Sequence, residues 1–188
     1  MSKFENYHSY LRERSLMGLI YRNFFLYPLI TRYLNGKILD YGCGIGDYLK
    51  YNNYSIGVDI NQHNVNFCKE RGLLASKIED GVIPFEDNHF DSVLSDNVFE
   101  HIENPKNIIL EIIRVTRPGG ILLIGVPGKL GFQSDADHKI FHDKQSLKAL
   151  FNDTNFKLKN NFDLPFSSNF LSKHLRQYTS WYLFKNEI

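Results

Sequence analysis

Residues Ile38 to Asp47 read Ile-Leu-Asp-Tyr-Gly-Cys-Gly-Ile-Gly-Asp, an apolar run that meets an acid and then places a glycine at every second position. Glycine has no Cβ, so the backbone can adopt positive φ there, and its N–H groups can approach a bulky polar ligand closely. We therefore expect a short strand followed by a tight turn that forms part of a nucleotide-type pocket.

The spacing of these glycines bears on which ligand the turn takes. A dinucleotide fingerprint that starts at Gly42 and Gly44 needs its third glycine at position 47, but this chain has Asp47 there and Gly46 one residue earlier. The spacing therefore disfavours NAD. A nucleotide-binding oxidoreductase stays open as an alternative, and so does a glycine-rich turn without any ligand.

The composition restricts the class of protein. The chain has 188 residues, which suits one domain with a full core, and 22 Lys and Arg residues nearly balance 21 Asp and Glu residues. The net charge of +1 predicts no nucleic-acid partner and no attraction to an anionic membrane. We find no basic leader and no run of about 18 uncharged apolar residues, and Cys43 and Cys68 lack metal-ligand spacing. We expect a cytoplasmic protein with free thiols.

Predicted strands and helices alternate along the chain. Residues 7–33 predict two helical pieces separated at Pro28, because proline breaks or kinks a helix. The expected strands are 37–40, 55–59, 73–78, 90–95, 121–126, 156–162 and 181–185. The expected helices after the first strand are 47–50, 62–71, one that starts near Pro105 and stops at Pro118-Gly119-Gly120, 144–152 and 168–176. This order predicts an α/β sandwich with helices on both faces of a sheet.

Polar residues follow three of the predicted strands. The glycine turn follows the first strand, Asp59 ends the second, and Asp96 comes directly after the fourth. In a parallel sheet the carboxyl ends of the strands meet at one edge, where ligands bind. The three positions therefore predict a single crevice.

The first motif, Asp40-x-Gly42-x-Gly44-x-Gly46, resembles that of class I S-adenosylmethionine-dependent methyltransferases that act on small molecules. A second stretch, Ile-Pro-Phe-Glu-Asp-Asn-His-Phe-Asp at Ile83 to Asp91, resembles the family's Leu-Pro-Phe-x-Asp-x-x-Phe-Asp. The resemblance implies a Rossmann-like, seven-stranded, mostly parallel sheet whose last strand is antiparallel. It also implies S-adenosylmethionine as cofactor and one methyltransferase domain over residues 1–188. We divide that domain into an N-terminal helical cap at 1–35, a cofactor-binding core at 36–127, and an acceptor-side C-terminal region at 128–188.

The resemblance assigns cofactor contacts. The turn from Tyr41 to Gly46 packs against the methionine part, and Asp59 accepts both ribose hydroxyls, since a carboxylate offers two acceptor oxygens. Many relatives have an acid that binds the adenine amino group where this chain has Lys77, and Glu79 is the nearest alternative. The implied cofactor residues are Asp40, Tyr41, Gly42, Gly44, Asp59, Ile60, Ile78, Glu79 and Asp96. Asp59 could instead cap the helix that begins near Asn61.

The segment from Ser95 to Ile102 resembles the one that faces the methyl acceptor. Glu100 and His101 are the predicted catalytic residues, because an imidazole accepts a proton near neutral pH and the carboxylate can assist it. Some relatives hold a divalent cation with Glu-x-x-Glu-His, but Asn97 replaces the first acid, so we expect no metal. A structural role for His101 is the other alternative. The predicted substrate-binding residues are Tyr10, Arg12, Asn97 and His138.

We therefore predict a methyltransferase that moves a methyl group to a hydroxyl or amine of a small biosynthetic acceptor, such as a sugar. A catalytically inactive cofactor-binding relative is a further alternative, because Asn97 and Lys77 depart from the family pattern. The oligomeric state stays open.

Overall fold

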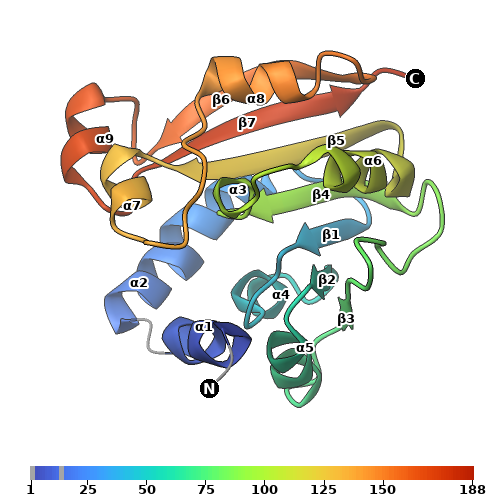
Figure 1. Cartoon of the computed structure of the whole chain (residues 1–188), viewed down its shortest axis with the longest axis horizontal. Coiled ribbons are helices and arrows are strands. Elements are labelled where there is room, and N and C mark those ends of the chain that lie inside the picture. The colour runs from blue at the N-terminus through green and yellow to red at the C-terminus, as the bar shows by residue number, and fades with distance from the viewer. Residues whose placement is uncertain (1–2, 13–14) are drawn as a thin grey trace.

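The computed structural model describes residues 3–12 and 15–188, except for the side chains of Lys3, Asn6, Tyr7, Tyr10 and Arg12. Its centre is a seven-stranded sheet in the spatial order β3-β2-β1-β4-β5-β7-β6 (Figure 1). The strands are β1 Ile38–Tyr41, β2 Ile56–Asp59, β3 Ala75–Lys77, β4 Phe90–Asp96, β5 Thr116–Pro127, β6 Phe156–Leu164 and β7 Thr179–Asn186. Strands β1 to β5 pair in parallel, whereas β7 is antiparallel to both of its neighbours, which confirms the predicted sheet.

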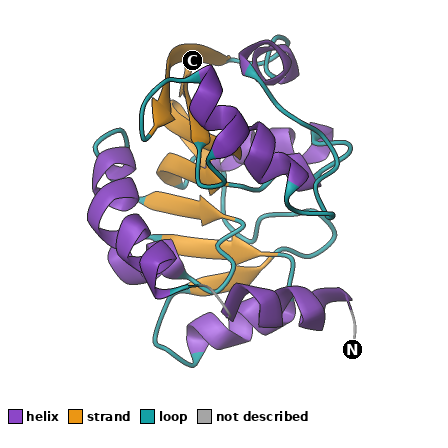
Figure 2. Ribbon diagram, turned by 90° about the vertical axis from the view of Figure 1, so that its left-hand side faces the viewer, coloured by secondary structure: helices purple, strands orange, loops and turns teal. Residues whose placement is uncertain are grey.

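Helices cover both faces of this sheet (Figure 2). They are α1 Lys3–Arg12, α2 Leu16–Tyr21, the π-helical turn η1 Arg22–Leu26, α3 Tyr27–Thr31, α4 Asp47–Tyr51, α5 Gln62–Lys69, the 3₁₀ turn η2 Phe99–His101, α6 Lys106–Val115, α7 Lys129–Gln133, α8 Lys144–Leu150 and α9 Asn169–His174. The sequence patterns did not predict η2 or α7, which are both short.

The two faces of the sheet have separate cores because successive residues on a strand point to opposite sides. Val93 of β4 packs with α6 and α8, whereas its neighbour Leu94 packs with α3 and α4. Leu122 and Leu123 of β5 divide in the same way. The predicted three-layer sandwich is therefore confirmed, with β4 and β5 as its buried centre.

The predicted break at Pro28 is wrong. The helical run continues from Leu16 to Thr31 through η1, where the Tyr27 N–H donates to the carbonyl of Arg22, five residues earlier. Pro28 lies in the first turn of α3. The π-helical turn directly before it carries the run up to the proline, so the helical run does not break there.

Strand β5 begins at Thr116, five residues before the predicted start at 121. Helix α6 already ends at Val115, and the Thr116 hydroxyl donates to the carbonyl of Ile112. The Pro118-Gly119-Gly120 segment, predicted as the helix stop, therefore lies inside β5. A register shift opposite Phe90 to Ser92 accommodates it in the pairing with β4.

The carboxyl ends of the parallel strands point to one side of the molecule, on the left in Figure 1, where α1 and α2 also lie. Figure 2 views the molecule from this side. Helix α1 contacts α5, which follows β2. The N-terminal helices thus lie beside the edge of the sheet where the predicted crevice falls. Within residues 3–12 and 15–188, no helix has the length and apolar character needed to span a bilayer.

Candidate active site

A cavity of about 780 Å³ lies at the carboxyl ends of the strands. Its wall includes most of the predicted site residues, which are Asp40, Tyr41, Gly42, Gly44, Asp59, Ile60, Ile78, Asp96, Asn97, His101 and His138. Glu100 lies fully buried behind His101. The structure therefore brings together residues that span about a hundred positions of the chain.

The glycine turn has its N–H groups directed into the protein, contrary to our expectation that they meet a ligand. The N–H groups of Gly42 and Cys43 both donate to the Val58 carbonyl, and that of Gly44 donates to Asp59 Oδ2 at 2.8 Å. Glycine is required here for conformation and packing. Gly42 has φ +77°, and a Cβ on it would lie 2.5 Å from Val98. The turn thus shapes the cavity wall through its backbone surface.

Asp59 is held by three protein donors. Its Oδ1 accepts from the Asn61 N–H at 2.7 Å, and its Oδ2 accepts from Gly44 N–H and, at 3.3 Å, from Asn64 Nδ2. A carboxylate has about four acceptor sites, so one is left for a ligand hydroxyl, and a second becomes available if Asn64 turns away. Helix α5 is capped by the Asn61 side chain, so the capping alternative for Asp59 is wrong. Burial raises the pKa of Asp59, which these donors oppose.

Glu79 does not join the cavity wall. Its side chain is 73% exposed and pairs with Lys77 at 3.4 Å, because the chain turns away from the sheet after β3. The expectation that Glu79 binds an adenine amino group is therefore wrong for this structure. Ile60 and Ile78 both line the cavity and supply apolar surface beside Asp59.

The N-terminal helical run supplies charged wall residues that the sequence analysis missed. Arg22 Nη1 lies 3.5 Å from Asp96 Oδ2, and Tyr27 lines the cavity beside it. Asp96 Oδ1 also accepts from the Asn97 side chain at 2.6 Å. An arginine flanked by the apolar runs Leu19 to Tyr21 and Phe24 to Leu26 is the signal that could have identified Arg22 as partly covered and paired.

Helix α1 closes the cavity over the glycine turn. Leu11 is buried, and its Cδ1 would be 3.3 Å from a Cβ placed on Gly44. The helix is fastened to α5 because the Phe4 carbonyl accepts from Asn61 Nδ2 and His8 Nδ1 lies 2.9 Å from Asn64 Oδ1. Tyr10 and Arg12, the predicted substrate contacts, lie in this helix, and their side chains are outside the described part of the chain.

Glu100, His101 and His138 form a cluster, of which His101 and His138 line the same cavity. One ligand atom from each lies within 4.8 Å of the other two, and the two imidazole rings meet edge to face at 4.6 Å. The backbone explains this meeting: the N–H groups of Lys139 and Ile140 both donate to the Glu100 carbonyl, which ties the loop after α7 to η2.

The electrostatics of the cluster are set by burial. Burial raises the pKa of Glu100 to about 8, and the carboxylates of Asp96 and Asp135 add to the rise while its own backbone N–H opposes it. Neither oxygen of Glu100 has a hydrogen-bond partner. Burial and then the neighbouring His138 lower the pKa of His101, which favours its neutral form at pH 7.

Comparison with known proteins bears on this site. Residues 39–124 match a family model described as a methyltransferase domain. A solved structure from Thermotoga maritima, a methyltransferase described as a possible histamine N-methyltransferase, superimposes with a TM-score of 0.73 at 15% identity and covers 98% of this chain and 99% of that one. Residues 39–124 of this chain thus match a methyltransferase domain, and the whole chain shares its fold with a solved S-adenosylmethionine-dependent methyltransferase.

The sequence relatives of this chain include an uncharacterised protein and a probable tRNA methyltransferase. An uncharacterised protein of Methanocaldococcus jannaschii is 35% identical over 64% of this chain and 57% of its own length. A human probable tRNA methyltransferase 9B is 36% identical over 53% of this chain and 24% of its own length. The chain thus covers little more than half, or less, of these relatives. The match to a methyltransferase domain disfavours the oxidoreductase alternative.

The cavity fits S-adenosylmethionine, the cofactor that the resemblance implies, by charge. Asp40, Asp47, Asp59 and Asp96 all line it. Burial raises the pKa of Asp40, and the Asp96 carboxylate adds to that rise, so a cationic ligand relieves their mutual repulsion. S-Adenosylmethionine carries a sulfonium and an ammonium and one carboxylate. The described wall thus offers carboxylates for its cations and Arg22 for its anion.

Proposed function

We propose that this methyltransferase binds S-adenosylmethionine in the 780 Å³ cavity and transfers its methyl group to a hydroxyl or amine of a small biosynthetic acceptor. The cofactor, when bound, supplies a methyl group already activated on a sulfonium, whose thioether leaving group needs no proton. The protein's part is therefore to bind, to align the acceptor, to exclude water and to remove the acceptor's proton.

The observation that carries this proposal is the placement of two chemically different walls in one cavity. The carboxylates of Asp40, Asp59 and Asp96 suit the cofactor, while His101 and His138, which form a cluster with the buried Glu100, line the same cavity. A cavity of this size is in the range of small-molecule sites. Helix α1 covers one side of it, so bulk water has limited access to the reacting atoms.

Each of these cavity residues then has a role in binding the cofactor or the acceptor. Asp59 accepts a hydroxyl hydrogen bond at its remaining acceptor site, and Asp96 with Arg22 pairs the two charges of the amino-acid end. His101, which lines the cavity and whose lowered pKa favours its neutral form at pH 7, takes the proton of the acceptor, a step that typically contributes about 10² to 10⁴-fold to the rate. Asn97 lies at the junction of the two walls, where it is a candidate acceptor contact.

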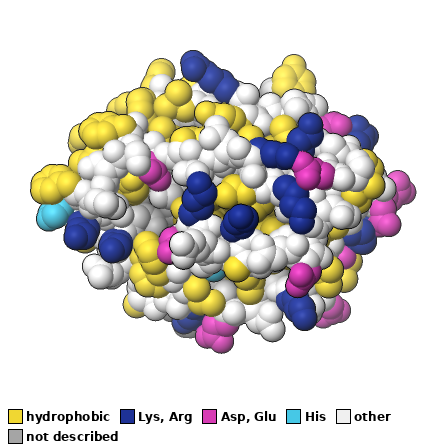
Figure 3. Space-filling model, turned by 90° about the horizontal axis from the view of Figure 1, so that it is seen from above, with side chains coloured by type: hydrophobic (Ala, Val, Ile, Leu, Met, Phe, Trp, Pro, Cys, Tyr) yellow, Lys and Arg dark blue, Asp and Glu magenta, His cyan; other side chains and the backbone are white. Residues whose placement is uncertain are grey.

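A nucleotide in a tRNA is the second candidate acceptor, and the similarity to the human probable tRNA methyltransferase favours it. Phosphate binding requires clustered Lys and Arg residues. The face seen in Figure 3 carries Lys and Arg side chains, but Asp and Glu side chains lie among them. Near the acceptor wall, Asp135 and Asp137 add negative charge. We therefore propose the small acceptor first.

The test is calorimetric titration of the protein with S-adenosylmethionine and S-adenosylhomocysteine, followed by methyl-transfer assays on panels of sugars, small amines and unmodified tRNA. A methyl increment on a sugar or amine supports the proposal. Methylation confined to tRNA replaces the acceptor class, and cofactor binding without transfer to any panel member supports the inactive relative. No cofactor binding by the folded protein rejects the proposal.

A further inference from the structure

Glu100 presents a chemical problem that methyl transfer by itself does not explain. Its side chain is 0% exposed, and neither oxygen has a hydrogen-bond partner. A buried carboxylate without a partner is costly, because its charge has lost its hydration and gained nothing in return. Such a group needs either a proton or a cation.

The hydrogen bond of His138 helps to decide between a proton and a cation on Glu100. Its Nδ1 lies 2.8 Å from the Phe132 carbonyl, which can only accept, so Nδ1 carries a hydrogen. In the neutral ring Nε2 then carries no hydrogen and has a free lone pair. This atom lies 3.8 Å from Glu100 Oε1 and 3.9 Å from Asp135 Oδ2. An imidazole whose Nδ1–H is held by a carbonyl is the usual arrangement of a metal-ligating histidine.

The distance also discriminates between the two possibilities. A proton shared by Oε1 and Nε2 requires about 2.7–3.2 Å between them. Two bonds of about 2.0–2.1 Å to one metal ion separate the ligand atoms by about 3.3 Å at a tetrahedral angle and about 4.1 Å when linear. The 3.8 Å separation falls within the metal-bridged range and outside the hydrogen-bonded one.

We propose that Glu100, His101 and His138 bind one divalent transition-metal cation. The third ligand is His138 from the loop after α7, in place of Asn97, whose Nδ2 donates to Asp96 Oδ1 at 2.6 Å. Two imidazoles and one carboxylate suit Zn²⁺, Mn²⁺ or Fe²⁺ better than Mg²⁺, which prefers oxygen ligands. Asp135 and Asp137, close to the two imidazoles, add negative charge around the ion.

The position of the site indicates what the ion does. His101 and His138 line the cavity, so the remaining coordination positions face the acceptor. A hydroxyl bound to such an ion loses its proton more easily than a free one. The inference goes beyond the proposed function, since metal binding can be measured without any methyl acceptor.

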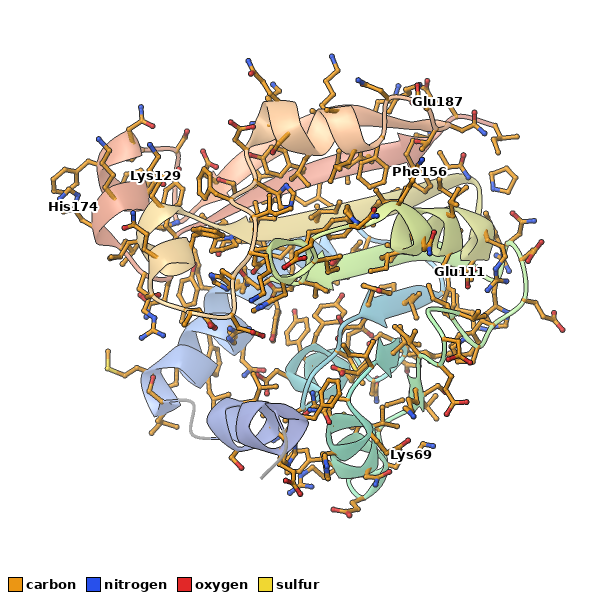
Figure 4. The ribbon with its side chains drawn as sticks, in the orientation of Figure 1. Lys69, Glu111, Lys129, Phe156, His174 and Glu187 are labelled. Carbon is orange, nitrogen blue, oxygen red and sulfur yellow. The ribbon has the colours of Figure 1, made fainter. Side chains whose placement is uncertain are left out.

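The experiment uses chelator-treated, full-length protein titrated with Zn²⁺, Mn²⁺ and Mg²⁺ by calorimetry, and with Co²⁺ by visible absorption. The variants are Glu100→Gln and His138→Gln, both of similar size to the native residue. The control is His174→Gln, because His174 is exposed and projects outward from α9 (Figure 4). Melting temperatures of each variant, with and without metal, show whether it is folded.

We expect one equivalent of Zn²⁺ or Mn²⁺ to bind, with affinity at least about tenfold weaker in both cluster variants and unchanged in the control. Metal should raise the melting temperature of the native protein and of the control but not of Glu100→Gln. Equal affinity in Glu100→Gln and the native protein, or no binding to the folded native protein, overturns the site. Cofactor binding that persists without metal leaves the proposed function standing when the metal site fails.

Discussion

At the scale of single residues, Gly42 is a position where both the backbone conformation and the packing require glycine. We predict that Gly42→Ala lowers the free energy of unfolding by about 1–3 kcal/mol, because φ is +77° and the new Cβ meets Val98 at 2.5 Å. In the double variant with Val98→Ala, the share of this loss in unfolding free energy that comes from the clash should be recovered. The share that comes from backbone strain should remain. Chemical denaturation of both variants measures this, and a complete recovery would show that strain contributes nothing.

Asp59 supports a second prediction at this scale. Asp59→Asn leaves one acceptor oxygen for the N–H groups of Gly44 and Asn61, which are both buried here. Leaving a buried donor unpaired costs about 1–3 kcal/mol. We expect a loss of that size in the free energy of unfolding together with at least about tenfold weaker binding of S-adenosylmethionine. The exposed Asp153→Asn is the control, and a stable Asp59→Asn protein with native affinity would contradict the prediction.

At the scale of elements, Arg114 joins α6 to the segment that leads into β4. Its guanidinium donates to the carbonyls of Ile83 and Phe85 and to Glu111, and Glu111 also accepts from the Ile83 N–H. The side-chain hydrogen bond from Arg114 is the main cause that lowers the pKa of Glu111 below its usual value of 4.5. The folded state therefore holds the charged carboxylate more strongly than the unfolded state does.

The sign of the pH dependence follows from this lowered pKa. The stabilisation by Glu111 is present in full above pH 4.5 and is lost as the pH falls through the lower folded-state value. Glu111→Gln should thus cost about 1 kcal/mol at pH 7, the size expected for a partly screened pair, and clearly less at pH 3. Urea unfolding at both pH values tests it, and an equal cost at the two values would reject the electrostatic account.

At the scale of the whole molecule, α1 is separable from the core. Among the described side chains of α1, none belongs to the hydrophobic clusters on the two faces of the sheet, and the described contacts of this helix go to α5 and the glycine turn. We predict that removal of residues 1–14 leaves the melting temperature within a few degrees but weakens S-adenosylmethionine binding at least about tenfold, because the cavity loses one wall. Calorimetry and thermal unfolding check this. Unchanged affinity would show that α1 does not retain the cofactor.

The sequence by itself determined the alternation of strands and helices along the chain. The apolar runs at Ile38–Tyr41 and Ile56–Asp59, the glycine spacing, and the order of strands and helices predicted the sheet and placed Asp59 and Asp96 at one edge. These features depend on neighbouring residues and on the period of side-chain direction, which a sequence displays directly.

Only the tertiary structure decided which distant side chains meet. His138 reaches Glu100 because a loop after α7 pairs with η2, and Arg22 reaches Asp96 because a π-helical turn carries the run past Pro28. The N–H groups of the glycine turn face inward because Asp59 and Val58 accept them. These contacts join segments whose separation in the chain carries no periodic signal, so packing alone determines them.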